Sequence, residues 1–241
     1  MKWEKIALIS VSIIVFSGLA GLNGCKDIVF NNPLDPNASQ DVLTVVRVIE
    51  TSLGGVGDIE FDGEKLWKIS STGIITAFDR ESGIVIRTFS SEPGTGLSFF
   101  RDSIYLCSGE NILVVIDPLS GDTLNRISTR DLYPGFLTTA NGRLIVYDVR
   151  SSGIFEYEPD SGNSTRLFEI SGINIGGIAS YRGGLLISDM NTDSIYRFSL
   201  SGQVSDVFTS PAAGVGGLTV DNGNYVYLFM LDGRVYKVSL P

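Results

Sequence analysis

Short apolar runs of about four to six residues, separated by polar turns, recur along most of the chain. The stretch 96–127 (GLSFFRDSIYLCSGENILVVIDPLSGDTLNRI) shows the unit and predicts four strands, at residues 97–100, 104–107, 112–116 and 123–127. Runs rich in β-branched and aromatic residues between such breaks are typical of consecutive antiparallel strands. A single four-stranded sheet cannot bury both of its faces, so this unit requires neighbours of the same kind.

The unit occurs five times. Its first strand is marked by aliphatic residues that are 38 to 41 positions apart: Ile59, Leu97, Leu137, Ile178 and Leu218. Turns rich in Asp, Asn, Ser and Gly follow the first and third strands, which suits tight turns with a left-handed last residue. A period of about 40 residues with four strands per repeat is the mark of a β-propeller. The competing fold, a β-helix, has shorter coils without this antiparallel turn chemistry.

The fifth repeat lacks its fourth strand, because residues 218–241 have room for only three strands. Residues 42–52 (VLTVVRVIETS) form a strand without a repeat, and we expect them to complete the last blade. The strand would bury Val42, Val46 and Val48 or their opposite-face neighbours, and closure would remove two exposed sheet edges. The prediction is an all-β, five-bladed propeller with four antiparallel strands per blade. Its blades are residues 54–91, 94–129, 135–170, 175–210, and 215–240 together with 42–52.

The first residues have the pattern of a secretory signal. Lys2 and Lys5 precede an apolar run at 6–20, which is shorter than the roughly 20 residues of a membrane-spanning anchor, the alternative interpretation. Residues 22–25 (LNGC) resemble a bacterial lipobox. The resemblance implies cleavage before Cys25 and acylation of that cysteine with diacylglyceryl and a further fatty acid such as palmitate.

We therefore predict a signal peptide at 1–24, a flexible tether at 25–41 and a propeller domain at 42–241. The protein would reside in the cell envelope, held to the membrane by the lipid on Cys25 on the extracytoplasmic side. In a Gram-negative host this would be the periplasmic face of the outer membrane.

Composition excludes several functions. A net charge of −9 leaves no basic stripe for nucleic acid. The sequence has no histidine, which removes the usual Ser-His-Asp and Cys-His catalytic sets and the commonest transition-metal ligand. Cys107 lies inside a predicted strand and is interpreted as a small buried hydrophobic residue. No cofactor is required, and we expect a monomeric propeller that binds an envelope protein or a small ligand.

One repeat differs from the others at its first strand. Asp58 occupies the position that the other repeats fill with Gly96, Phe136, Gly177 and Gly217. Glu60 occupies the position that they fill with Ser98, Thr138, Ala179 and Thr219. One blade thus brings two carboxylates to the channel, and we place the ligand site at the mouth near Asp58, among the inter-blade loops. A dehydrated carboxylate there has a raised pKa unless a cation compensates it, either Arg130, Lys68 or something bound.

Asp148 and Asp189 end their second strands at matching positions on the same predicted face, with Arg150 and Asn191 beside them. One interpretation is an acidic site for a cation or a cationic ligand, in which Asp58 would join them if the metal is Ca²⁺. The alternative is that Asp148 and Asp189 accept hydrogen bonds from backbone amides of their turns. The longest inter-blade loop adds residues that would contact a ligand or only cap the ring: Arg130, Asp131 and Tyr133.

Residues 61–89 (FDGEKLWKISSTGIITAFDRESGIVIRTF) and 185–202 (LLISDMNTDSIYRFSLSG) resemble repeats of lactonase-like, NHL-type and glutamine cyclotransferase-type propellers. The resemblance covers 42–240 at the level of the repeat. Five-bladed glutamine cyclotransferases carry FTQG and a LYEST-like stretch in the first blade, where this chain has VGDI (56–59) and LWKISS (66–71). Asp58 replaces the glutamine, and Lys68 stands near the place of the acid.

The sequence favours a non-catalytic binding or scaffold module with its ligand site at the channel mouth. The alternative is a propeller enzyme, either a lactonase, another hydrolase or a glutamine cyclotransferase-like protein. Asp58 and Glu60 would then perform acid–base chemistry, which requires that one of the two has a raised pKa.

Overall fold

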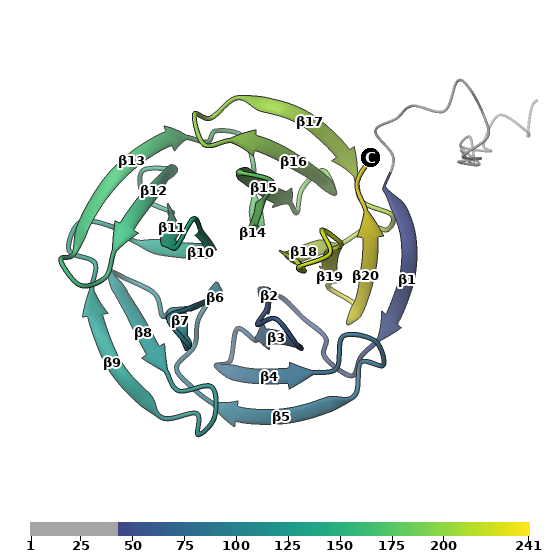
Figure 1. Ribbon diagram of the computed structural model, residues 1–241, viewed down its shortest axis with the longest axis horizontal. Helices are drawn as coiled ribbons and strands as arrows, with labels where there is room; N and C mark the ends of the chain where they lie inside the picture. The colour runs from purple at the N-terminus through teal and green to yellow at the C-terminus, as the bar shows by residue number, and fades with distance from the viewer. Residues whose placement is uncertain (1–42) are drawn as a thin grey trace, which may run out of the picture. The chain divides into compact units, whose positions relative to one another are not determined.

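The computed structural model describes residues 43–241, which form five four-stranded antiparallel sheets arranged as a ring (Figure 1). The all-β five-bladed propeller is confirmed. The predicted signal peptide, the lipidation site Cys25 and the tether lie outside the described residues. None of the described residues forms a helix with the length and hydropathy of a membrane span.

Each blade begins at the axis of the ring and ends at its rim. The innermost strands are β2 (Ile59–Phe61), β6 (Leu97–Phe100), β10 (Pro134–Ala140), β14 (Ile175–Tyr181) and β18 (Val215–Val220). The second strands are β3 (Leu66–Ile69), β7 (Ser103–Cys107), β11 (Arg143–Asp148), β15 (Gly184–Asp189) and β19 (Val226–Met230).

The outermost strand of each blade is largely exposed, whereas the third strand beside it is mostly buried or half-buried. The third strands are β4 (Ile74–Phe78), β8 (Ile112–Ile116), β12 (Gly153–Glu158), β16 (Ser194–Ser199) and β20 (Arg234–Ser239). The outermost strands are β5 (Val85–Ser90), β9 (Thr123–Ser128), β13 (Asn163–Glu169), β17 (Val204–Thr209) and β1 (Thr44–Glu50).

The ring closes through the N-terminal strand, as the sequence predicts. β1 pairs with β20 in an antiparallel register that runs from Thr44 opposite Ser239 to Glu50 opposite Arg234, with one irregularity after Val45 (Figure 1). The last sheet therefore combines the first strand of the domain with the last three.

The valines named in the sequence prediction are not the buried residues of β1, because Val46 and Val48 are 50% and 41% exposed. Ile49, one of their opposite-face neighbours, is buried in the layer between the last and the first blade. Leu43, just before β1, is buried in the layer on the other side of the last blade.

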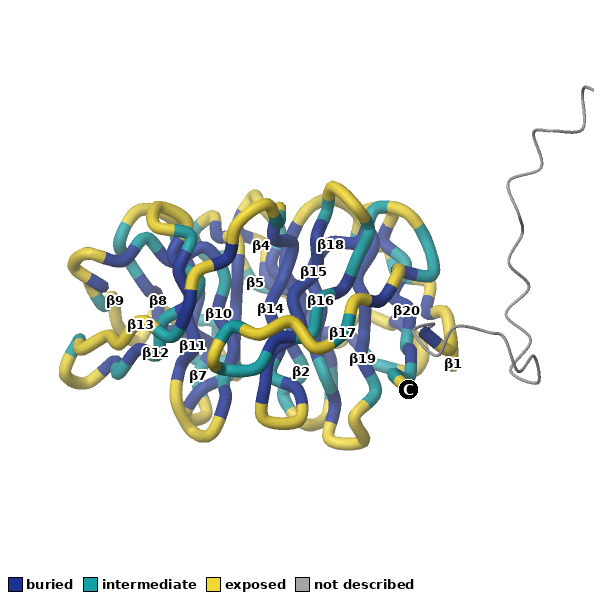
Figure 2. The backbone as a smooth tube through the Cα atoms, turned by 90° about the horizontal axis from the view of Figure 1, so that it is seen from above, coloured by how far each residue is buried: buried dark blue, intermediate teal, exposed yellow. Residues whose placement is uncertain are grey.

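The hydrophobic core lies between adjacent blades. Ile49 of β1 packs with Ile59 and Leu66 of the first blade and with Phe229 of the last, so the closing strand seals one of these layers. Trp67 lies in the next layer, against Phe99 at 5.5 Å between ring centroids. Figure 2 shows buried strand centres between two faces of exposed turns.

Candidate functional site

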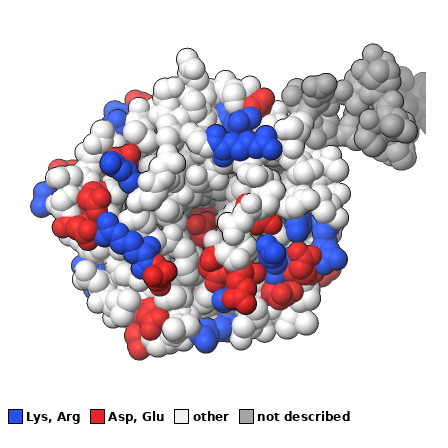
Figure 3. Space-filling model, viewed as in Figure 1, with Lys and Arg blue, Asp and Glu red and all other residues white. Residues whose placement is uncertain are grey.

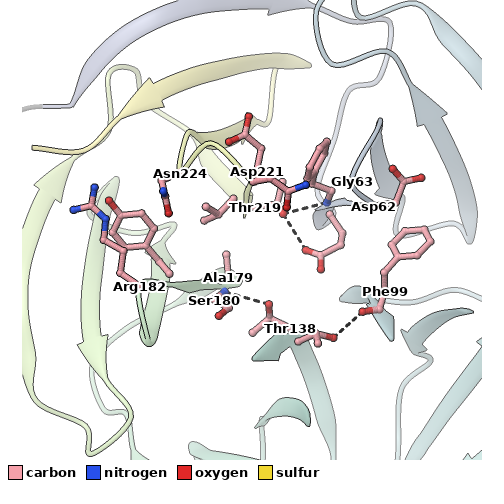
Figure 4. A pocket seen from close by; sticks show the side chains of 16 residues that line it. Asp62, Gly63, Phe99, Thr138, Ala179, Ser180, Arg182, Thr219, Asp221 and Asn224 are labelled. Atoms are coloured by element: carbon pink, nitrogen blue, oxygen red, sulfur yellow. Dashed lines mark hydrogen bonds between the residues drawn. The ribbon is translucent and has the colours of Figure 1, made fainter. Parts of the chain in front are cut away.

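The channel opens into a cavity of about 520 Å³ on the face that carries the turns between first and second strands (Figure 4). All five innermost strands contribute to its lining, through Glu60, Phe99, Thr138, Ala179 and Thr219. Turn residues form the rest of the wall, among them Asp62, Gly63, Arg182, Asp221, Asn222 and Asn224. The innermost strands thus supply the floor of the cavity and the turns supply its rim.

Glu60 is the carboxylate that reaches the cavity from an inner strand. It is 8% exposed and accepts hydrogen bonds from the hydroxyls of Ser98 and Thr219, each at 3.0 Å. Burial raises its pKa to about 7, although hydrogen bonds from Ser98, Thr219 and the backbone of Phe99 act in the opposite direction. Within residues 43–241 it forms no ion pair. Glu60 can therefore exchange a proton near neutral pH or accept a cation.

The hydroxyls at the level of Glu60 are the residues that the repeat alignment places there. Thr219 Oγ1 also accepts from the backbone N–H of Phe61, and Thr138 Oγ1 accepts from the backbone N–H of Ser180 (Figure 4). These bonds join neighbouring inner strands. The ring of side chains around Glu60 is thus held in place by the backbone of the adjacent blades.

Two further acids stand at the rim of the cavity. The first, Asp62, accepts from two backbone N–H groups of its turn, from Trp67 Nε1 and from Lys65 Nζ. The second, Asp221, accepts from backbone N–H groups in the matching turn of the last blade and lies 3.5 Å from a nitrogen of Arg80. Figure 3 shows acidic side chains inside and beside the central hollow. Asp62 and Asp221 each have a basic neighbour, so Glu60 is the acid of this wall that lacks one among the described residues.

Asp58 lies at another level of the channel, two residues before Glu60, and is enclosed. It is 1% exposed, and its Oδ1 accepts from the backbone N–H of Ile59 at 2.9 Å. Its Oδ2 is buried without a hydrogen-bond partner in the described part of the chain. Burial, followed by the charge of Glu60, raises the pKa of Asp58 well above its usual value.

Glycines in the inner strands β14 and β18 make room for Asp58. A Cβ atom on Gly177 or Gly217 would lie 2.8 or 2.7 Å from Asp58 Oδ1. The same added atoms would come within 2.7–2.8 Å of backbone atoms of the next strand, so the inner strands approach one another closely at this level. The glycine positions of the repeat alignment therefore mark the narrow part of the channel.

Neither cation that the sequence offered as an internal partner pairs with Asp58. Lys68 is 3% exposed, its Nζ lies 4.8 Å from the centroid of the Phe229 ring, and burial lowers its pKa. Arg130 is exposed in its loop. No ion pair of Asp58 exists among residues 43–241. The carboxyl group is thus uncompensated, and its raised pKa favours the neutral form.

The other predicted site residues do not line this cavity. Asp148 accepts from the backbone N–H groups of Tyr133 and Ser151, and Asp189 accepts from those of Asn174 and Asn191. These are the turn hydrogen bonds that the structural alternative expects. The two aspartates order matching loops at the ends of second strands.

The residues beside these aspartates interact locally. The Arg150 guanidinium donates to the Tyr133 hydroxyl at 3.0 Å and lies 4.9 Å from the centre of its ring. The Asn191 side chain accepts from that of Asn174, and the exposed Asp131 stays on the loop surface. The face predicted to bind the ligand is thus the one opposite the cavity.

Asp58, Asp148 and Asp189 are not brought together as metal ligands. The described residues contain no group of three or more Asp, Glu or Cys side chains placed to hold a metal ion. The calcium hypothesis therefore finds no ligand set in this part of the chain.

The sequence interpretation missed most of the cavity wall, including its polar end residues Asp62, Tyr181, Arg182 and Asp221. In the sequence, Asp62, Arg182 and Asp221 are typical turn residues, and Tyr181 is typical of the apolar end of a strand. Their position could have identified them, because all four lie at or just after the end of an inner strand.

No family model matches this sequence, and no curated protein matches it. Solved structures do resemble the fold. Glutaminyl cyclase from Myxococcus xanthus superposes with a TM-score of 0.69 at 14% identity, over 82% of this chain and 95% of that one. A streptogramin B lyase gives a TM-score of 0.51 at 12% identity, over 81% and 97% of the two chains.

A catalytically inactive virginiamycin B lyase from Staphylococcus aureus, solved with quinupristin, gives a TM-score of 0.50 at 16% identity. The match covers 76% of this chain and 66% of the lyase. The resemblance to glutaminyl cyclase-type propellers is thus confirmed at the level of the fold. Identities this low establish the fold alone.

Proposed function

We propose that this chain is a lipid-anchored, extracytoplasmic binding module whose ligand site is the cavity around Glu60. The single observation that carries the proposal is a cavity of about 520 Å³ with a buried, uncompensated carboxylate at its floor. Its volume falls within the roughly 300–1,000 Å³ range of small-molecule sites. The surrounding hydroxyls and aromatic rings are the groups that fix such ligands.

A purely structural role explains Glu60 less well. A buried carboxylate that serves stability alone is normally paired with a cation or several backbone donors, because its dehydration is costly. Asp62 and Asp221 meet this expectation in the same wall, each with backbone donors and a basic neighbour. Glu60 accepts from two neutral hydroxyls and one backbone N–H and has no basic neighbour in the described residues, which leaves its charge to be balanced from the cavity.

Ligand binding is tested by a thermal-shift screen of small molecules on three proteins: the wild type, Glu60→Thr and Glu50→Thr. The Glu60 substitution introduces the residue that other blades use at this level. Glu50, on the exposed end of β1, is the matched control. A compound that stabilises the wild type and the control but not Glu60→Thr supports the proposal. If every stabilising compound acts equally on all three proteins, the ligand site lies elsewhere.

The membrane anchor is tested separately, since it depends on residues outside the described part of the chain. Cys25→Ser should abolish sedimentation of the mature protein with membranes while leaving the melting temperature of the propeller unchanged. A variant that still sediments after alkaline washing contradicts the lipid anchor.

An enzymatic function is the second candidate, favoured by the pKa of Glu60 at about 7. A group with this pKa can act as general acid or base near neutral pH. The test is to incubate the protein with a peptide that begins with glutamine and to follow the loss of ammonia by mass spectrometry. Turnover that disappears in Glu60→Gln supports the enzyme; a peptide left intact by the wild type rejects the glutamine cyclotransferase alternative.

A further inference from the structure

The three acidic residues of the cavity wall differ in what already balances their charge. Asp62 lies 3.0 Å from Lys65 Nζ, and Asp221 lies 3.5 Å from a nitrogen of Arg80. Glu60 has only the two hydroxyl donors and the backbone contact described above. A carboxylate has about four lone-pair positions on its two oxygens, so Glu60 retains acceptor capacity. Of the three acids, Glu60 is therefore the one that a bound cation would contact.

Aromatic side chains stand beside Glu60 in the same cavity. Phe61 and Phe99 line it and are each partly exposed. The guanidinium of Arg80 lies 5.2 Å from the Phe61 ring centroid, so a cation of the protein already occupies that position. An organic ammonium offers a charge for Glu60 and a carbon part for the remaining apolar surface of the wall, whereas an inorganic cation offers only the charge.

An inorganic divalent cation fits these groups poorly. Calcium takes six to eight oxygen ligands, usually with several carboxylates. Here one carboxylate is uncompensated, and no cluster of metal-ligating side chains exists in the described residues. The partly exposed aromatic rings would also remain unused.

Building on the proposed function, we infer that the cavity binds a small organic ammonium whose cation contacts Glu60. Its apolar part lies along Phe61 and Phe99, which line the same cavity.

The probe for this inference is phenylalaninol, which carries an ammonium, a hydroxyl and a phenyl ring. Its neutral control is 3-phenylpropane-1,2-diol, in which a hydroxyl replaces the ammonium. With about 11 non-hydrogen atoms, such a ligand is expected to bind with a Kd of roughly millimolar or tighter. Binding is followed at pH 8 by NMR titration of the wild type, Glu60→Gln and the control Glu50→Gln.

We expect the wild type and Glu50→Gln to bind the amine at least about tenfold more tightly than the diol, as a charged hydrogen bond implies. Glu60→Gln should remove that preference while still binding the diol. Equal binding of both probes by the wild type and Glu60→Gln, with shifts at Phe61 and Phe99, overturns the ammonium but retains a ligand-binding cavity.

Two other outcomes also count against the inference. Binding that shifts residues outside the cavity overturns the assignment of the site. No binding of either probe at tens of millimolar, an order above the expected Kd, overturns the inference as stated. In that case the thermal-shift screen decides separately whether the cavity takes a ligand at all.

Discussion

Asp58 and Glu60 lie two residues apart on one inner-strand segment, yet they occupy different surroundings. At the level of Asp58 the last two blades supply Gly177 and Gly217, and the carboxyl group is enclosed with one oxygen unpaired. At the level of Glu60 the neighbours supply Ser98, Thr138 and Thr219, and a cavity opens. Both residues are carboxylic acids, so the inner strands of the other four blades determine which of the two carboxyl groups a ligand can reach.

The difference between the two levels shows how a repeat protein can acquire a ligand-binding site. Glycine at one level lets the inner strands approach until their backbones are in contact, which closes the channel around Asp58. Hydroxyl side chains at the next level hold the strands apart and supply hydrogen bonds to Glu60. A charge that departs from the repeat is available to a ligand only where its neighbours leave space.

The largest loss of stability is expected from opening the ring, which would disturb the surroundings of both Asp58 and Glu60. A chain that begins at Ser52 lacks β1, and with it the pairing to β20 and the burial of Ile49. At roughly 25 cal/mol per Å² of apolar surface, the loss amounts to several kcal/mol, comparable to the stability of many domains. Urea unfolding measures it. A chain that begins at Asn37 should match the full domain, and equal stability of the two shortened chains would contradict closure by β1.

The sequence predicted the fold because its signals are local and repeated. Turn residues, strand length and the five aligned aliphatic positions fix a blade, and the missing fourth strand of the last blade identifies β1 as its complement. Each of these signals needs only the order of residues. The fold could therefore be derived without distances.

The open mouth of the channel could not be predicted in this way. The alignment shows that Asp58 shares a level with Gly177 and Gly217, but it does not show how closely the strands approach there. The unpaired hydroxyl of Tyr181 is equally invisible, because an apolar strand end with a tyrosine is ordinary core. What the sequence did contain was the set of hydroxyls around Glu60, which marks the level where the cavity lies.

The next effect concerns the ionisation of the two carboxyl groups. A raised pKa means that the folded state holds a proton that the unfolded state has released. Stability should therefore fall as pH rises from 4.5, the ordinary value for Glu60, to about 7. The cost at higher pH is about 3 kcal/mol for a shift of this size.

Glu60→Gln should remove most of this slope, and Asp58→Asn should remove its own contribution, which has the same sign. Urea titrations between pH 4 and 8.5 measure the slopes, with Glu50→Gln as the control on an exposed strand. A slope that is unchanged in the Asp58→Asn/Glu60→Gln double variant would show that other groups set the pH dependence.

The close approach of the inner strands around Asp58 can be tested by replacing two adjacent glycines, one at a time, with alanine. Gly217→Ala places a Cβ 2.7 Å from Asp58 Cα and from the backbone N of Ile59, whereas the nearest atom to a Cβ on Gly216 is 3.3 Å away. Overpacking of this kind costs about 1–3 kcal/mol. Gly217→Ala should therefore lower stability by about 2 kcal/mol, and Gly216→Ala by clearly less. Similar losses for the two variants would argue that the strands are not crowded around Asp58.

The smallest effect is expected at the rim, where Tyr181→Phe deletes a hydroxyl that has no partner among the described residues. The ring stays buried against the last blade, so packing is retained. Removing an unsatisfied buried group should leave stability equal or raise it by up to about 1 kcal/mol, whereas removing a bonded hydroxyl lowers it by a similar amount. Thermal unfolding of the ligand-free protein therefore distinguishes the two cases by sign. A clear loss of stability would mean that the hydroxyl already has a hydrogen-bond partner in the folded protein.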